Sequence, residues 1–368
     1  MFDKNILEDL CAVLTESQSL LKEKQVLVGF DGYIDKLVHL KRNQNQPPEY
    51  FKTIGEFSGH IVSNSNQSCD IEVDCISEKL GGNGPLLAEA LAAKGVQTTC
   101  IGAFGYPKLH KSFDSFAKRC KAISVEQPAN TFAMEFSDGK LMFGDSDSLA
   151  HIDFAKICDR VGLNELEQLI DECDLFCFTN WSGLLYSNDL LEGISGKVCP
   201  KLSEKERMAF FDLADPSPKS AEEFQQFFDL LLKFKEHFWT IIGLNPKECL
   251  LVYNQFFQKE ETCFAPNMLE ELRLLFPADE IAFHGIDYAI AGTQLITMKT
   301  VQGERVENPK VVTGGGDNFN SGYCTGKLMG LSPTLCACLG NFSSMLFVAN
   351  GESPNLSHIL NFITDTLL

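Results

Sequence analysis

The chain has 368 residues, 44% of them hydrophobic, and its formal net charge is −19. This length is enough for one large buried core or two smaller ones. Such an acidic surface repels phosphate backbones and anionic lipid headgroups, so the charge excludes nucleic acid and membrane surfaces as expected partners.

Cysteine usage and the N-terminus indicate a reducing compartment. The 14 cysteines lie mostly in apolar runs, where a thiol behaves as a small hydrophobic group. Met1 is not followed by a signal-peptide pattern, and no apolar run approaches the roughly 18 residues of a membrane helix. We therefore expect a cytoplasmic protein.

The first 35 residues predict a helix followed by a buried strand. Apolar residues at helical spacing between residues 6 and 21 indicate the helix. Residues 25–30 form a short, continuous apolar run with Gly29 near its end, which is typical of a buried strand. We interpret residues 1–24 as a helical extension and residues 25–35 as the start of the core.

Residues 36–75 and 131–144 differ from the core pattern. The first segment contains a polar, proline-bearing stretch at residues 43–49. In the second, strand-like residues 132–136 and 140–144 flank an Asp-Gly turn, which is a hairpin signal. We predict that the two segments form a small β lid.

From about residue 145, helix and strand patterns alternate to the C-terminus. Strands are expected at 175–179, 208–213 and 239–244, each after a helical stretch. This alternation predicts a mostly parallel sheet with helices on both faces, and ligands of such sheets bind beyond the carboxyl ends of the strands. We assign the following residues to this α/β core: 25–35, 76–130 and 145–368.

The sharpest motif is Val312-Thr-Gly-Gly-Gly-Asp-Asn-Phe-Asn-Ser-Gly322, between a strand candidate at Pro309–Val312 and a helix candidate. Gly314, Gly315 and Gly316 permit close backbone approach, and their N–H groups at a helix start can form an anion hole. Asp317 is placed to accept a proton from an attacking hydroxyl, as phosphoryl transfer requires. The alternative is a glycine turn with an acidic residue at a helix start.

A second glycine motif opens a helix after residue 80. Gly81 and Gly82 precede Asn83, whose amide offers donors and an acceptor suited to sugar hydroxyls. The alternative is an ordinary joint between a strand and a helix.

Two carboxylates follow the first strand. Asp31 and Asp35 can accept hydrogen bonds from several hydroxyls of a polyol. The alternative is a polar loop with an Asx-turn.

Asn245 follows the strand at 239–244 as an N-cap, with Pro246 at the first helical position. In this structural interpretation, the only role of Glu248 is to place a favourable negative charge in the first turn of the helix. The functional interpretation directs Asn245 and Glu248 toward phosphates and magnesium-bound water.

Together and in this order, the four motifs resemble those of the PfkB/ribokinase family of carbohydrate kinases. Residues 211–217 and 347–354 are similar to that family's Asp-rich strand end and closing segment, so the resemblance spans about residues 25–355. It implies a ribokinase-like α/β fold: a central, mostly parallel sheet with helices on both faces, and a small β lid.

The resemblance implies an ATP-dependent kinase that uses Mg²⁺ and phosphorylates a hydroxyl of a sugar or sugar-like molecule. Asp317 would be the general base, with the three glycines before it as the anion hole. The other implied roles are substrate binding by Gly81, Gly82, Asn83 and Asp35 or Asp31, phosphate and water-mediated Mg²⁺ binding by Asn245 and Glu248, and nucleotide binding by Asn341 and Gly292.

The chain departs from the family at Val311, where many relatives carry an Asp that helps bind a monovalent cation. The resemblance therefore leaves dependence on such a cation open. It also leaves open a nucleoside kinase of the same fold, a sugar-binding protein without catalysis, and ADP as the donor. Because lid edges in this family can pair between subunits, a homodimer is a further expectation.

Overall fold

The structure is a computed structural model that describes residues 3–17, 19–43, 47–311 and 313–367. The strands are β1 (Gln25–Gly29), β2 (Tyr33–Leu40), β3 (Val73–Gly81), β4 (Gln97–Gly102), β5 (Lys121–Ser124), β6 (Ala129–Phe136), β7 (Gly139–Asp145), β8 (Leu175–Phe178), β9 (Met208–Asp212), β10 (Trp239–Leu244), β11 (Glu280–His284), β12 (Tyr288–Thr293) and β13 (Lys299–Gln302). The α-helices are α1 (Lys4–Ser17), α2 (Ile54–Ser63), α3 (Asn83–Ala93), α4 (Phe154–Arg160), α5 (Leu163–Glu172), α6 (Ser187–Gly193), α7 (Ala221–Lys235), α8 (Pro246–Phe257), α9 (Pro266–Leu275), α10 (Gly315–Leu328), α11 (Pro333–Asn350) and α12 (Leu356–Leu367).

A large sheet of nine strands forms the centre of the molecule, in the order β13-β12-β11-β10-β9-β8-β1-β4-β5. The strands from β11 to β5 are parallel, whereas β12 and β13 pair antiparallel. The chain leaves β1 toward β4 on one side and later returns to β8 on the other. Such a reversal in strand order creates a crevice at the carboxyl ends, where ligands bind in open α/β sheets.

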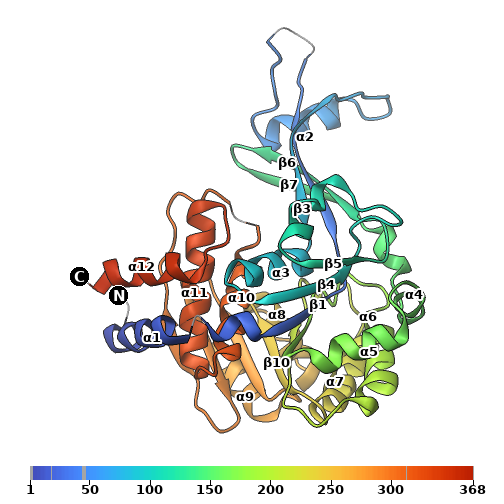
Figure 1. The fold of residues 1–368 in the computed structure, drawn as a ribbon. Coiled ribbons are helices and arrows are strands. Elements are labelled where there is room, and N and C mark those ends of the chain that lie inside the picture. Colours follow the sequence, from blue (N-terminus) through green and yellow to red (C-terminus); the bar gives the residue numbers. More distant parts are fainter. Residues whose placement is uncertain (1–2, 18, 44–46, 312, 368) are drawn as a thin grey trace.

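Helices cover both faces of this sheet, as Figure 1 shows. One buried cluster joins the sheet to α4, α5, α6, α7, α8 and α9, and the second joins it to α1, α3, α10, α11 and α12. The predicted mostly parallel sheet between two helical layers is therefore confirmed.

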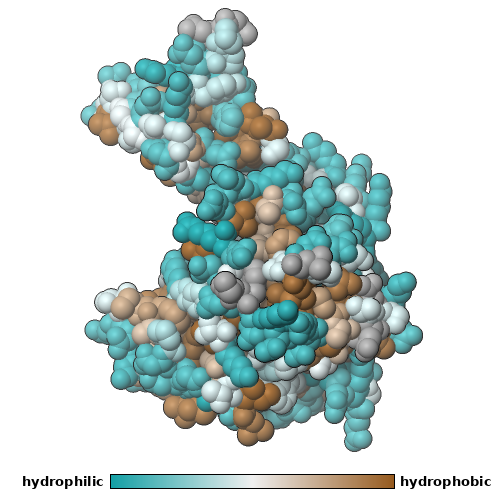
Figure 2. Space-filling view, turned by 90° about the vertical axis from the view of Figure 1, so that its left-hand side faces the viewer, coloured by the Kyte–Doolittle hydropathy of each residue, from teal (hydrophilic) through white to brown (hydrophobic). Residues whose placement is uncertain are grey.

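The lid is a second sheet of four strands, in the order β3-β2-β6-β7. Helix α2 packs on it through Phe57, whose ring centroid lies 5.8 Å from that of Phe136 and 5.6 Å from that of Phe51. Figures 1 and 2 show the lid standing out from the body. The small sheet also takes in Tyr33 and Gly81, which lie outside the segments predicted for the lid.

Two predicted elements differ from the observed ones. The N-terminal α-helix ends at Ser17, and a 3₁₀ turn at Leu20–Glu23 then leads into β1. The strand predicted at Pro309–Val312 is wrong for residues 309–311, which are irregular, while Val312 lies outside the described residues. The backbone N–H of Lys310 donates to the carbonyl of Val348 in α11, so this segment is held by a helix end and not by the sheet.

Candidate active site

The two glycine motifs meet at the carboxyl end of β1. Asn83 is the first residue of α3, and Asp317 lies in the first turn of α10. The side-chain amide of Asn83 donates to Oδ1 of Asp317 over 3.0 Å, although the two residues are 234 positions apart. The fold therefore brings the predicted substrate motif to the predicted base.

Asp31 holds the start of α3. Its carboxylate accepts hydrogen bonds from the backbone N–H groups of Asn83 (2.9 Å) and Gly84 (2.8 Å), and it is 0% exposed. A Cβ at Gly84 would lie 2.6 Å from Asp31 Oδ1, so glycine at this position lets the carboxylate approach. Because Asp31 is enclosed and already bonded, this arrangement favours Asp35 as the carboxylate that contacts a substrate.

Asp35 lies on the lid strand β2, opposite Thr131 of β6. A Cβ at Gly81 would lie only 2.4 Å from Asp35 Oδ2, so this glycine allows the carboxylate to lie against the second motif. Burial raises the pKa of Asp35, while the hydrogen bond from Thr131 and the charge of Lys140 lower it. Asp35 is half-buried, as expected for a group on a lid that faces the core.

The third motif forms the start of α10. Gly314 is the N-cap residue and has a φ of 93°, a left-handed conformation that favours glycine. Gly315 and Gly316 form the first turn, whose backbone N–H groups have no acceptor inside the helix. An anion placed there gains from these donors and from the positive end of the helix dipole.

A cleft of about 460 Å³ opens beside this helix start. Gly315 and Gly316 form one wall, the start of α8 at Asn245 a second, and α11 a third. The other lining residues are Pro246, His284, Gly285, Ile286, Gly303, Glu304, Arg305, Val306, Glu307, Pro309, Phe319, Asn341, Ser344, Met345 and Val348. This volume is within the range of small-molecule sites, about 300–1,000 Å³.

Two residues predicted for the nucleotide pocket have different positions. Asn341 lines the cleft, and its amide donates to the carbonyl of Val301 over 3.1 Å. Gly292 lies inside β12, where a Cβ would meet the carbonyl of Ile296 and the side chain of Met298, each at 2.8 Å. Gly292 is the second-to-last residue of β12 and is not among the described residues that line the cleft, so its role in nucleotide binding stays a prediction.

Asn245 and Glu248 form a reciprocal cap on α8. The Asn245 side chain accepts from the N–H groups of Lys247 and Glu248, and the Glu248 carboxylate accepts from the backbone N–H of Asn245 over 2.9 Å. Burial raises the pKa of Glu248 well above its ordinary value, and the nearby charge of Asp212 raises it further. The capping interpretation is thus observed, and it leaves Asn245 at the cleft wall.

The chain is similar to known kinases over nearly its whole length. A family model described as prokaryotic ketohexokinase matches residues 2–366. The chain belongs to this family. The kinase is 24% identical over 350 residues to a ketohexokinase from Haloferax volcanii, with 93% of this chain and 92% of the relative aligned.

Solved structures give the same fold at lower identity. Ribokinase from Thermotoga maritima has a TM-score of 0.63 at 14% identity, covering 92% of this kinase and 98% of that chain. Adenosine kinase from Sinorhizobium meliloti has a TM-score of 0.64 at 14% identity, covering 94% and 99%. A ribokinase II from E. coli, in complex with ATP and Mg²⁺, has a TM-score of 0.62 at 14% identity, covering 93% and 99%. The chain is therefore a carbohydrate kinase with the ribokinase fold, as its motifs predicted.

Buried acidic groups surround the start of α10 in this kinase. Burial raises the pKa of Asp317 well above its ordinary value, the charges of Asp212 and Asp31 raise it further, and the hydrogen bond from Asn83 lowers it. Burial likewise raises the pKa of Asp31 to about 6. A raised pKa brings a carboxyl group closer to the pH at which it can exchange a proton efficiently.

Sequence reasoning did not single out Asn180, Asp212 or His284. Asp212 lies in the Asp-rich segment that had been noted only as a resemblance, and Asn180 is signalled only by its place after a predicted strand. Burial lowers the pKa of His284 to about 4, and the ring lies against Gly316, 3.4 Å from the position of a Cβ there. No spacing pattern in the sequence connects these residues, because the sheet alone brings them together.

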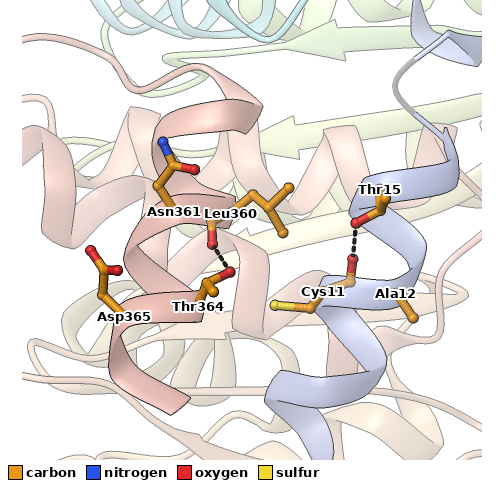
Figure 3. A pocket seen from close by; sticks show the side chains of 7 residues that line it. All are labelled: Cys11, Ala12, Thr15, Leu360, Asn361, Thr364 and Asp365. Atoms are coloured by element: carbon orange, nitrogen blue, oxygen red, sulfur yellow. Dashed lines mark hydrogen bonds between the residues drawn. The ribbon is translucent and has the colours of Figure 1, made fainter. Parts of the chain in front are cut away.

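A larger hollow of about 700 Å³ lies elsewhere, between α1 and α12 (Figure 3). The hydroxyls of Thr15 and Thr364 that line it donate to carbonyl groups of their own helices. No motif residue that the structure describes lines this hollow, so the cleft beside α10 is the better candidate despite its smaller volume.

The described ranges contain neither a membrane-spanning helix nor a cluster of candidate metal ligands. None of their helices has the length and hydrophobicity that crossing a bilayer would require. Nor does this part of the chain gather three or more His, Cys, Asp or Glu side chains as candidate metal ligands.

Proposed function

We propose that this kinase transfers the γ-phosphate of ATP to a hydroxyl of a ketohexose such as fructose, with Asp317 as the general base. The observation that carries this proposal is the hydrogen bond from Asn83 to Asp317, because it joins the substrate motif to the base beside the cleft. The ketohexose is supported by the matching family description and by the aligned relative from Haloferax volcanii.

The cleft beside α10 fits a nucleotide. Its wall of Phe319, Met345 and Val348 is apolar and suits a base, while the first turn of α10 offers free N–H donors to phosphates. Arg305 is a cationic side chain at the cleft. We propose that ATP with Mg²⁺ occupies this cleft and supplies the phosphoryl group.

Asn245 and Glu248 fit a role toward Mg²⁺ through water. Mg²⁺ keeps several of its waters and needs only one or two protein carboxylates when phosphates complete its shell. Glu248 is buried and bonded to Asn245, which lines the cleft, so it would reach the ion through water and without a dedicated metal cage. The asparagine would orient the phosphates from the cleft wall.

The charge around Asp317 favours a neutral substrate over a sugar phosphate. Asp31 and Asp212 lie near the base, and a phosphorylated sugar would require Lys or Arg there. Lys36, on the lid strand β2, has its ammonium over the Phe132 ring, 5.2 Å from the centroid. A neutral polyol can instead donate hydrogen bonds from its hydroxyls to the half-buried Asp35.

The residues of the kinase then have distinct tasks. Asp35 and Asn83 orient the sugar, and Asp317 accepts the proton of the attacking hydroxyl. The N–H groups at Gly315 and Gly316 stabilise charge that develops on the transferring group. The lid carries Asp35, so its movement toward the body would exclude water as it brings that carboxylate to the sugar.

The test is a coupled assay of ADP release with ATP and Mg²⁺ against ketohexoses, aldohexoses, sugar phosphates and nucleosides. We expect the highest kcat/KM with a ketohexose, and NMR of the product identifies the phosphorylated hydroxyl. The same panel repeated with ADP as donor and with and without K⁺ tests the donor and the monovalent cation. Activity with nucleosides alone would contradict the proposed substrate, and sugar binding without turnover would contradict the proposed reaction.

A further inference from the structure

The carboxylates around the base are connected to one another by asparagines. Asp317, Asp31 and Asp212 lie at the ends of different elements, and each is at least nine-tenths buried. The hydrogen bonds run from Asn83 Nδ2 to Asp317 (3.0 Å), from Asn83 N to Asp31 (2.9 Å), from Asn180 Nδ2 to Asp31 (2.9 Å) and from Asn320 Nδ2 to Asp212 (2.6 Å). The backbone N–H of Trp181, the residue after Asn180, donates to the carbonyl of Asp212 over 3.2 Å. We call this set the carboxylate–asparagine network.

Asn180 is the central link of this network. It follows β8, is 6% exposed and has a φ of 55°, a left-handed conformation that a non-glycine residue seldom adopts. Its side-chain Nδ2 donates to Asp31 over 2.9 Å, and its Oδ1 accepts from the N–H of Gly183 over 3.2 Å. Asn180 thus solvates the buried carboxylate of Asp31, and the next residue, Trp181, bonds to the backbone of Asp212.

The network matters because a buried carboxylate stays ionised only while donors replace its lost water. Each asparagine amide donates to one buried carboxylate: Asn83 to Asp317, Asn180 to Asp31 and Asn320 to Asp212. Removal of the Asn180 amide would leave Asp31 with two of its three donors, and Asp31 is the group that holds Asn83 at the start of α3. A disturbance at β8 therefore reaches Asp317 without direct contact.

We propose that Asn180 and Asp212 are positioning residues of the kinase: through the carboxylate–asparagine network they hold the Asp317 carboxylate in place and set the charge around it. The proposal rests on the proposed function, in which Asp317 is the base. Asn180 acts through Asp31 and Asn83, whereas Asp212 acts through its charge and through the hydrogen bond that it accepts from Asn320 on α10.

The titratable groups that face Asp317 come from several elements. Asp212 at the end of β9 is the charged neighbour that raises its pKa most, followed by Asp31 after β1. Glu248 of α8 interacts with Asp317 as a further acid, and His284 of β11 lies against the adjacent Gly316 as a neutral ring. Removal of the Asp212 charge should therefore lower the pKa of the base.

The first variant is Asn180→Gly, which keeps the left-handed backbone and its N–H while deleting the amide. We expect kcat to fall about 10- to 100-fold, as for a small displacement of a reacting group. Calorimetric titration should give a sugar Kd within about twofold of the wild type, because Asp35, on the lid strand β2, is not part of the network. The matched control is Gln258→Gly, an exposed residue with a φ of 53° at the end of α8, and it should leave both values unchanged.

The second variant is Asp212→Asn, which removes the charge and keeps the shape. Oδ1 of Asn320 is buried without a hydrogen-bond partner among the described residues, so a flip of its amide can accept from the new Nδ2. We expect the acid limb of the kcat/KM profile to move to lower pH by roughly 0.5–1 unit. The control is Asp159→Asn, which removes one exposed charge and should leave the limb in place.

The outcomes test the proposed function and the positioning roles of Asn180 and Asp212 separately. An inactive wild type would contradict the proposed function. An active wild type whose acid limb is unmoved in D212N would contradict the tuning role of Asp212. A folded N180G with normal kcat would contradict the positioning role of Asn180, and if N180G fails to fold in a thermal scan, the D212N profile alone decides.

Discussion

At the scale of single residues, the site depends on glycines that let carboxylates approach the backbone. A Cβ at Gly84 would meet Asp31 Oδ1 at 2.6 Å and the Thr179 hydroxyl at 3.2 Å, both within a buried region. We expect Gly84→Ala to destabilise the kinase by about 1–3 kcal/mol and to lower kcat, because either Asp31 or α3 must move. Urea unfolding and the coupled assay measure the two effects.

The matched control for this variant is Gly59→Ala. Gly59 lies inside α2, and a Cβ there would meet nothing within 4 Å. Alanine should be neutral or slightly stabilising at this position, by up to about 1 kcal/mol, because it favours helix. Equal stability losses in the two variants would contradict the steric role assigned to Gly84.

The motifs identified several of these residues from sequence because each motif has a local signature. Asn245 is readable as a helix cap, and Gly314, Gly315 and Gly316 as a glycine turn before a helix, with Asp317 directly after them. The sequence does not decide whether Asp31 or Asp35 contacts the substrate. The burial of Asp31 and the partial exposure of Asp35 depend on the packing of α3, which no local pattern shows. Asn180 has no local signature, and its role appears only when β8 lies beside β1.

At the scale of elements, apolar periodicity predicted most strands and helices of the core. The wrong predictions have physical reasons. Residues 309–311 have a strand-like sequence, but their backbone bonds to the end of α11, so they do not join the sheet. The lid strand β2 begins at Tyr33, earlier than predicted, because pairing with β3 and β6 continues to the edge of the core. The polar composition of the lid segment does not mark the residue at which this strand begins.

The exposed edge of the lid sheet predicts that two chains associate. Strand β7 forms one edge of the small sheet, and its residues Met142 and Phe143 are 54% and 52% exposed. Figure 2 shows hydrophobic patches on the lid. An exposed edge with apolar side chains can pair with a second chain, so we expect sedimentation equilibrium to give a homodimer at micromolar concentration.

A double variant tests this assembly directly. Met142→Lys with Phe143→Lys should shift the equilibrium toward monomer by at least about tenfold in Kd, because charges on an edge oppose pairing. Leu295→Lys, which changes a 96% exposed hydrophobic residue between β12 and β13, is the control and should leave the dimer intact. A wild type that sediments as a monomer would contradict the expectation.

At the scale of the whole molecule, one buried cation connects α3 to α10 behind the site. The Lys94 ammonium donates to Ser321 Oγ over 2.9 Å and to the carbonyl of Ala90 over 3.2 Å. Burial lowers its pKa to about 7. Because an unfolded Lys titrates near about 10.4, the unfolded state binds more protons between these values, so this group makes stability rise with pH across that window.

Lys94→Met should therefore stabilise the kinase most below pH 7. Methionine fills a similar volume without charge, and Ser321 keeps its own bond to the carbonyl of Asn318. We expect a Tm gain of a few degrees at pH 6 that shrinks at pH 9, relative to the exposed control Lys118→Met. A gain that does not change with pH would show that packing and not charge determines the effect.

The central claim is that Asp317 is the base of a sugar kinase, and Asp317→Asn tests it most directly. The measurement compares kcat for a ketohexose with the sugar Kd from calorimetry, in the wild type and in the variant. The account predicts a fall in kcat of about three orders of magnitude or more with little change in Kd, because the amide keeps the shape but accepts no proton. Near-normal turnover in the variant would contradict the assignment of the base.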